Sequence, residues 1–182
     1  MERLYKGNSL IRKLDDYTVL DIETTSLDTF SGEIVEISAI KVRDRKEIDS
    51  FSKLIKTKNE IGYFTTRLTG ITNEMIEKQG KELVDVLKNF KDFLGNDIIV
   101  GHNVNFDINF IYDNMQENLN EYLSNDFVDT LRISRKVLPN LRHHKLDDLI
   151  QYFNLERRNE HRALNDCVLT NQVYINLAKM LK

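Results

Sequence analysis

The chain has few of the residues that bridge, stiffen or interrupt a polypeptide. Its 182 residues include one cysteine, one proline, seven glycines and no tryptophan. A single cysteine, Cys167, excludes an internal disulfide and favours a reducing, cytoplasmic location. It falls in a helical apolar pattern, and we expect it to be a small core residue. No apolar run approaches the ~20 residues of a membrane-spanning helix, so we expect no membrane partner.

The composition is that of an ordinary globular protein. Hydrophobic residues make up 41% of the chain and charged residues 30%, a balance typical of soluble domains. The length suits one hydrophobic core, and we find no repeat, linker or low-complexity segment. Residues 1–13 are charged and lack the apolar centre of a secretory signal. We therefore expect one domain over residues 1–182.

The charge is uneven along the chain. The formal net charge is −3, which argues against a surface coated in basic residues for non-specific nucleic-acid binding. Residues 131–162 nevertheless carry eight Lys or Arg against four Asp or Glu. Most of these side chains are expected on solvated helix faces. A basic flank beside an acidic pocket would also suit an enzyme that acts on phosphate esters.

Three strands are predicted at the start of the chain. Residues 17–20 form an apolar strand, residues 33–42 alternate between apolar and polar, and residues 47–55 return as a third strand after a charged turn. Short turns between consecutive strands indicate an antiparallel meander.

Helices then predominate. Helical spacing of apolar residues predicts helices over 73–77, 83–94, 106–115, 130–138, 146–153 and 163–181. Short apolar strands are expected at 98–100 and 127–128, and residues 65–72 are expected to be a loop. The pattern predicts an α/β fold with a mixed five-stranded sheet, three antiparallel strands first, flanked by helices.

Two carboxylates stand where the first strand ends. Asp21 and Glu23 occupy alternate positions, so their side chains point to the same face. Like charges this close repel, and burying them is costly unless they share a cation. Alternatively, one faces solvent and the other caps the turn that follows.

Two later segments also place acidic residues at helix starts. Around Gly101 the pattern is strand, tight turn and helix, with Asp107 in the first turns of that helix. Asp166 stands at the start of the last helix, five residues after His161, which lies in a charged loop just before that helix. Either aspartate can also be explained by its interaction with the helix dipole.

Together these segments resemble the DEDDh 3′–5′ exonucleases, a family of DnaQ-like proofreading subunits with a ribonuclease-H-like fold. Asp21-x-Glu23-Thr24-Thr25-x-Leu27 is similar to the first motif of the family. His102-Asn103-x-x-Phe106-Asp107 resembles the second motif, and His161-Arg162-Ala163-Leu164-x-Asp166 resembles the third. The likeness covers residues 17–174. Ser26 departs from the glycine most common at that place, which affects the geometry of the turn.

The resemblance implies a mechanism. Asp21, Glu23, Asp107 and Asp166 would be catalytic and would bind two divalent cations, Mg²⁺ or Mn²⁺, whose preferred ligands are carboxylate oxygens. His161 would be the general base, because an unperturbed imidazole titrates near pH ~6.5.

The resemblance also implies a seat for the substrate's terminal nucleotide. Leu27 and Phe106 would flank the last bases, although core packing is an alternative for both. Thr24 and Thr25 would contact the 3′ end, and Asn103 would orient the strand. The segment His143-His144-Lys145 either contacts the phosphate backbone or caps the helix that starts near residue 146, and we favour capping.

The expected activity is therefore metal-dependent 3′–5′ exonuclease cleavage that releases nucleoside monophosphates from single-stranded or frayed DNA, in proofreading or repair. An exoribonuclease of the same family is the alternative, and a non-catalytic nucleic-acid-binding module is disfavoured because all four carboxylates and the histidine are present. Residues 128–155 look closest to the exonuclease domain of Gram-positive replicative polymerases. The expected partner is the 3′ end of a single strand, with DNA favoured over RNA. The chain is expected to be either a stand-alone nuclease or one that docks on a DNA polymerase through its surface.

Overall fold

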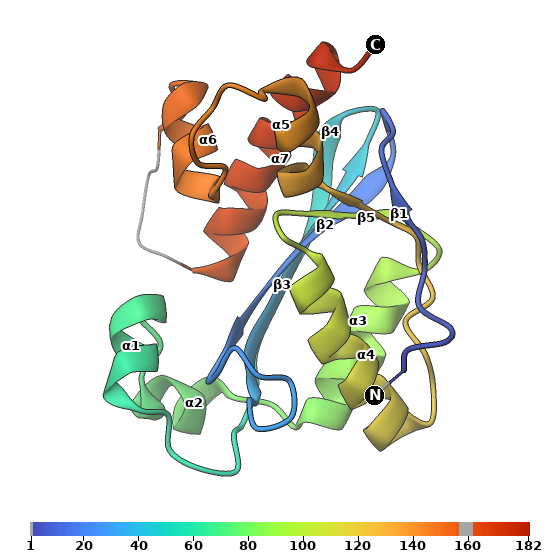
Figure 1. Cartoon of the computed structure of the whole chain (residues 1–182). Coiled ribbons are helices and arrows are strands. Elements are labelled where there is room, and N and C mark those ends of the chain that lie inside the picture. Colours follow the sequence, from blue (N-terminus) through green and yellow to red (C-terminus); the bar gives the residue numbers. More distant parts are fainter. Residues whose placement is uncertain (1, 157–161) are drawn as a thin grey trace.

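The computed structural model describes residues 2–156 and 162–182 (Figure 1). The strands are β1 (Ser9–Leu10), β2 (Tyr17–Thr24), β3 (Ile34–Arg43), β4 (Lys46–Leu54), β5 (Ile99–Gly101) and β6 (Phe127–Asp129). The helices are α1 (Tyr63–Thr69), α2 (Asn73–Gln79), α3 (Leu83–Leu94), α4 (Asn105–Leu119), α5 (Thr130–Val137), α6 (Leu146–Tyr152) and α7 (Ala163–Met180).

The strands form one mixed sheet in the order β1-β6-β5-β2-β3-β4. Strands β1, β6, β5 and β2 are parallel, whereas β3 is antiparallel to both of its neighbours. The short apolar strand β5 is wholly buried between β6 and β2. The α/β class, the mixed sheet and the antiparallel opening are therefore as predicted.

Helices cover both faces of the sheet (Figure 1). One core joins the sheet to α3 and α4, and a second joins it to α5, α6 and α7. Alternation along β2 assigns the faces, because Leu20 and Ile22 belong to the α3–α4 core whereas Tyr17 and Val19 belong to the α7 core. By the same alternation, Asp21 and Glu23 lie on the face that α7 covers.

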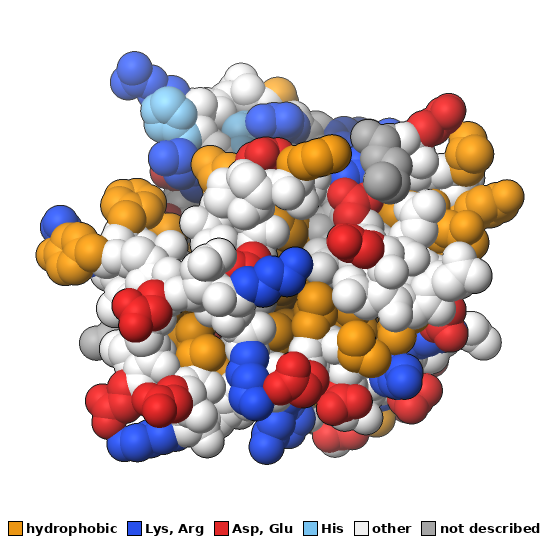
Figure 2. All heavy atoms as spheres, turned by 90° about the horizontal axis from the view of Figure 1, so that it is seen from below, with side chains coloured by type: hydrophobic (Ala, Val, Ile, Leu, Met, Phe, Trp, Pro, Cys, Tyr) orange, Lys and Arg blue, Asp and Glu red, His pale blue; other side chains and the backbone are white. Residues whose placement is uncertain are grey.

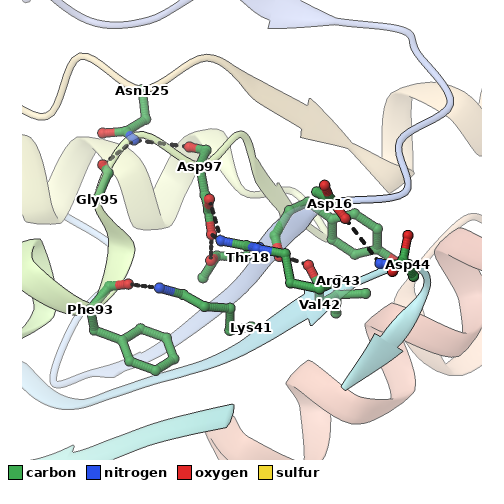
Figure 3. Close-up of polar contacts among 11 residues, drawn as sticks. Asp16, Thr18, Lys41, Val42, Arg43, Asp44, Phe93, Gly95, Asp97 and Asn125 are labelled. Atoms are coloured by element: carbon green, nitrogen blue, oxygen red, sulfur yellow. Dashed lines mark hydrogen bonds and ion pairs between the residues drawn. The ribbon is translucent and has the colours of Figure 1, made fainter. Parts of the chain in front are cut away.

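A polar network ties the N-terminal end of β2 to the loop after α3 (Figure 3). The guanidinium of Arg43 donates to both carboxylate oxygens of Asp97, at 2.7 and 2.8 Å, and the Thr18 hydroxyl donates to Asp97 at 2.6 Å. The side-chain amide of Asn125 donates to the carbonyls of Gly95 and Asp97, each at 2.9 Å. These contacts hold the end of the sheet opposite the carboxylates of β2.

Two elements differ from the sequence-based prediction. The sheet has a sixth strand, β1, where five were predicted, and β1 pairs with β6 through only two residues. Residues 65–72 were predicted to be a loop, but Tyr63–Thr69 form helix α1, which ends at Gly70 with a φ of 71°. Helix α1 was missed because its large apolar residues Tyr63, Phe64 and Leu68 are exposed and leave no buried apolar stripe.

None of the helices in residues 2–156 and 162–182 combines the length and the apolar character that crossing a membrane requires.

Candidate active site

Three carboxylates meet between β2 and α7. Asp21 and Glu23 extend from β2, and Asp166 extends from the first turn of α7. One carboxylate oxygen from each residue lies within 4.8 Å of the other two. The packing of α7 onto β2 therefore produces the cluster that the sequence pattern predicted for these residues.

A fourth carboxylate, that of Asp107, reaches the same place from the first turn of α4. The residue is only 5% exposed, and its Oδ1 accepts a hydrogen bond from the backbone N–H of Ile22 at 3.1 Å. Ile22 lies between Asp21 and Glu23, so this bond fixes Asp107 beside both of them. The structure thus brings the four predicted acidic residues together, three in a tight group and the fourth adjoining it.

These carboxylates repel one another strongly. Burial raises the pKa of Asp21 well above its ordinary value, and the charges of Asp107, Glu23 and Asp166 raise it further. Burial also raises the pKa of Glu23 to about 8, with Asp166 adding to the rise. Burial likewise raises the pKa of Asp107 well above its ordinary value. Such a cluster holds its negative charge at neutral pH only if cations offset it.

The donor set fits hard divalent cations. Every member of the tight group is a carboxylate, the ligand that Mg²⁺ and Mn²⁺ prefer. Cys167 lies nearby on α7 but is fully buried, and its thiol donates to the backbone carbonyl of Ser38 at 3.3 Å. Burial, followed by the charges of Asp21 and Asp107, raises the pKa of this thiol. Cys167 is a core residue, as predicted from the sequence.

An ion pair with one buried partner lies next to the cluster, and the sequence-based analysis did not identify it. Glu36 on β3 is fully buried and pairs in register with Glu23. Its carboxylate accepts hydrogen bonds from the Arg162 guanidinium at 2.8 and 3.2 Å and from the Ser52 hydroxyl at 3.0 Å. Because Arg162 is the N-cap residue of α7, this pair anchors the start of the helix that carries Asp166.

The turn after β2 is held by its own hydroxyl groups. Thr24 donates to the carbonyl of Ser26 at 2.8 Å, and the Thr25 hydroxyl accepts from the backbone N–H of Glu33 at 2.9 Å. Leu27, in contrast, is 87% exposed, and Phe30 is 89% exposed. Core packing is therefore excluded for Leu27, whereas substrate contacts by Thr24, Thr25 and Leu27 stay predictions.

The turn before α4 places the remaining predicted substrate residues. Asn103 has an exposed side chain and a φ of 56°, and its backbone N–H donates to Asp129 Oδ1 at 2.9 Å. Phe106 is partly buried, and its ring centroid lies 4.9 Å from that of Phe110. Core packing thus accounts for much of the Phe106 surface, while the Asn103 side chain is accessible.

The histidines differ in their surroundings. His161, the predicted general base, lies outside the described residues. His102 faces the Thr130 hydroxyl at 2.9 Å, and burial lowers its pKa to about 4, so it is neutral at physiological pH. His144 bonds the Ser134 hydroxyl at 3.0 Å rather than capping α6. Lys145 is the N-cap residue of α6, so the capping prediction for the segment His143-His144-Lys145 holds for Lys145.

Sequence comparison identifies related exonuclease domains. The profile of the RNase_T exonuclease family matches residues 18–174. A DNA polymerase III PolC-type from Latilactobacillus sakei is 37% identical over 176 residues, covering 97% of this chain and 12% of that protein. A PolC-type polymerase from Bacillus subtilis is 34% identical over 179 residues, covering 98% of the chain and 12% of the relative. The chain thus spans about an eighth of the length of these relatives.

Several solved structures of similar fold are exonucleases. Exonuclease X, solved in complex with 5′ overhanging duplex DNA, superposes with a TM-score of 0.71 at 24% identity over 90% of this chain and 91% of its own. An exonuclease I from E. coli, solved as a zinc-bound complex with single-stranded DNA, gives a TM-score of 0.75 at 18% identity over 91% of this chain and 42% of its own. At these identities the likeness establishes the fold.

Proposed function

Because this chain belongs to the RNase_T exonuclease family, we propose that it is a metal-dependent 3′–5′ exonuclease that releases nucleoside monophosphates from single-stranded or frayed DNA. The observation that carries the proposal is the meeting of Asp21, Glu23 and Asp166 within 4.8 Å, with the buried Asp107 adjoining them. A protein with only a structural role would gain nothing from the repulsion within this cluster, whereas a phosphodiester hydrolase needs such a cation-binding site.

The four carboxylates would hold two divalent cations, Mg²⁺ or Mn²⁺. Such ions supply positive charge that acidifies water and offsets the charge of a phosphodiester. The protein's part is to fix the carboxylates before substrate arrives. The hydrogen bond from Ile22 to Asp107 and the Glu36–Arg162 pair at the start of α7 support that preorganisation.

The general base in this proposal is His161. It directly precedes Arg162 in the sequence, and the hydrogen bonds between Arg162 and Glu36 hold the backbone that follows it. An imidazole with an ordinary pKa near ~6.5 accepts a proton from water at neutral pH.

The terminal nucleotide would lie against the turn after β2. Leu27 and Phe30 expose nearly their whole side chains there. Packing a base on an exposed apolar side chain is favourable, and stacking on an aromatic ring such as that of Phe30 typically stabilises the complex by about 1–3 kcal/mol. Thr24 and Thr25 keep this turn in one conformation through their hydroxyl groups.

DNA is the proposed substrate because the relatives that match the chain over most of its own length are DNA polymerases of the PolC type. We accordingly propose a proofreading or repair role in association with a DNA polymerase. A proofreading nuclease should remove a mispaired 3′ nucleotide faster than a paired one, because a mispaired end separates from its template more often.

The test uses matched DNA and RNA oligonucleotides labelled at the 5′ end, incubated with Mg²⁺, Mn²⁺ or EDTA. A 3′–5′ exonuclease yields a ladder of progressively shorter labelled products, whereas the opposite polarity releases the label at once as a mononucleotide. A ladder from RNA alone would replace the DNA assignment with the exoribonuclease alternative. Binding without metal-dependent cleavage of either strand would leave only a nucleic-acid-binding module.

A further inference from the structure

A basic cavity opens beyond the carboxyl ends of β5 and β6. It has a volume of about 530 Å³ and lies between the turn after β5, helix α5 and the loop before α6. Arg135, Arg142 and Lys145 contribute exposed cationic side chains to its lining, and His102 and Asn103 form the side nearest α4. His102, His143 and His144 all line this cavity, and Figure 2 shows histidine side chains beside Lys and Arg side chains at the upper left of the view.

The lining of the cavity carries cationic side chains without an acidic one among them. Within residues 2–156 and 162–182, neither Arg135, Arg142 nor Lys145 forms an ion pair with an acidic residue. A chain with a net charge of −3 therefore keeps a local concentration of cations here, which attracts anions.

The nearby acidic residues are engaged by the backbone. Asp129 accepts from the N–H groups of Asn103 and Leu131, each at 2.9 Å. Asp148 accepts from the N–H of Lys145 at 2.8 Å. These carboxylates hold the turns around the cavity in place.

The cavity adjoins the cleavage site through the order of the sheet. Strands β6, β5 and β2 are parallel neighbours, so their carboxyl ends meet at one edge of the sheet. The carboxylates lie at the end of β2, and the cavity lies beyond the ends of β5 and β6. With strands about 4.8 Å apart, the two places are separated by roughly 5–10 Å, a span that a short length of single strand covers.

We propose that this cavity binds a backbone phosphate of the substrate strand on the 5′ side of the cleaved bond. Arg135 and Arg142 supply paired N–H donors that match phosphate oxygens, and Lys145 supplies a compact charge. His102 is neutral and forms part of the wall, joined to Thr130 and His144. The assignment rests on the proposed exonuclease function, because it identifies the path by which the remaining strand leaves that site.

The first experiment measures binding without chemistry. A 5′-fluorescein eight-nucleotide DNA is titrated with protein in EDTA, and its anisotropy is recorded at several salt concentrations. We expect the triple variant Arg135→Gln, Arg142→Gln, Lys145→Gln to raise Kd about tenfold, a value typical of a few partly exposed charge contacts. The slope of log Kd against log salt should fall by about 0.7 for each phosphate released.

A matched control removes the same charge elsewhere. Lys53, Lys81 and Lys88 line a separate surface depression away from the carboxylates. The triple variant Lys53→Gln, Lys81→Gln, Lys88→Gln carries the same net charge as the cavity variant. Equal Kd values for the two variants would overturn the proposal, because they would show that the change in net charge alone accounts for the rise in Kd. A larger loss in the cavity variant supports it.

The second experiment separates a strand phosphate from a free one. In Mg²⁺, the cavity variant and the control are compared on a dinucleotide, which contains only the scissile phosphodiester, and on the eight-nucleotide strand. The advantage of the longer strand is the ratio of its kcat/KM to that of the dinucleotide. We expect this ratio to be about tenfold smaller in the cavity variant than in the control. An unchanged advantage would contradict the assignment. The assignment would also be wrong if inorganic phosphate bound in the cavity while kcat/KM did not depend on the length of the strand.

The two proposals fail in different ways. If neither substrate is hydrolysed by the wild-type chain in Mg²⁺ or Mn²⁺, the exonuclease function is wrong, and the anisotropy measurement still decides whether the cavity binds the strand. If hydrolysis is normal and the variants are indistinguishable, only the cavity assignment is wrong.

Discussion

At the scale of single residues, the candidate site concentrates negative charge, which lowers the stability of the metal-free protein. Asp21 lies among three other acidic residues, and burial together with their charges raises its pKa because its ionised form is unfavourable without a cation. Natural proteins tolerate such local conflict where function requires it. Each carboxylate should therefore have opposite effects on the metal-free and the metal-bound protein.

The substitution Asp21→Asn tests this directly. It keeps the shape of the side chain and removes its charge, so we expect the metal-free protein to unfold at the same temperature or higher. Mg²⁺ should then stabilise the variant less than the wild type, and hydrolysis of oligonucleotides should fall below detection. Thermal unfolding in EDTA and in Mg²⁺ measures the first two effects. A variant that still hydrolyses DNA with Mg²⁺ would contradict the assignment of Asp21 as a ligand.

His161 should affect turnover without affecting metal binding. Replacing it with alanine removes the proposed general base, a group typically responsible for about 10²–10⁴-fold in rate. We expect kcat to fall by that factor while Mn²⁺ still raises the unfolding temperature as it does in the wild type. A wild-type rate in His161→Ala would show that another group accepts the proton.

At the scale of elements, the site depends on how α7 is attached to the sheet. The pair between Glu36 of β3 and Arg162 at the start of α7 joins positions 126 residues apart, and Glu36 retains only 1% of its side-chain exposure. Loss of one partner leaves a buried charge without a counter-charge, which typically lowers the free energy of unfolding by about 3–5 kcal/mol for a fully buried pair. The partial exposure of Arg162 reduces that cost.

A double-mutant cycle should reveal this coupling. The variants Glu36→Gln and Arg162→Gln, alone and together, should give a coupling free energy of about 1–3 kcal/mol in urea unfolding. We also expect Arg162→Gln to lower kcat more than it raises KM, because the start of α7 carries Asp166. The exposed Lys56–Glu82 pair provides the control, with an expected coupling below about 1 kcal/mol. Equal coupling in the two cycles would contradict a special role for Glu36.

The sequence-based predictions succeeded where local pattern is strong. Alternating apolar residues in β2 and β3 and helical spacing in α3 and α4 gave the order of the main elements. Three short motifs gave the four acidic residues that the structure brings together. Strand β1 was missed because two residues carry no periodicity, and its partner β6 is far along the chain. Glu36 was missed because only tertiary contact with Arg162 distinguishes it from an ordinary strand glutamate.

At the scale of the whole molecule, the carboxylate cluster makes the stability of the metal-free protein depend on pH. The pKa of Glu23 is about 8 in the folded chain, above its ordinary value. The folded state therefore binds more protons than the unfolded state between those two values. By linkage, the contribution of Glu23 to stability is fully present below the ordinary pKa of glutamate, ~4.3, and is lost as pH rises through about 8.

Thermal unfolding in EDTA should show this loss. We expect the contribution of Glu23 to lower the unfolding temperature by about 5 °C or more between pH 5 and 8. Mg²⁺ should restore stability most at the high end of this range, where the carboxylates are ionised. The variant Glu23→Gln is the control, and its unfolding temperature in EDTA should vary less with pH. A wild-type protein whose difference from Glu23→Gln did not change with pH would refute this account.

The topology of the sheet also has a consequence for when the site can form. Strands β2, β3 and β4 follow one another along the chain, so their antiparallel pairing closes only short loops and can form early. Asp107 reaches Ile22 across 85 residues, and Arg162 reaches Glu36 across 126. Parallel pairing of β2 with β5 likewise waits for a long crossover. Asp21 and Glu23 should therefore be in place well before their partners, so that hydrolytic competence arises only with the last, slowest docking step of folding.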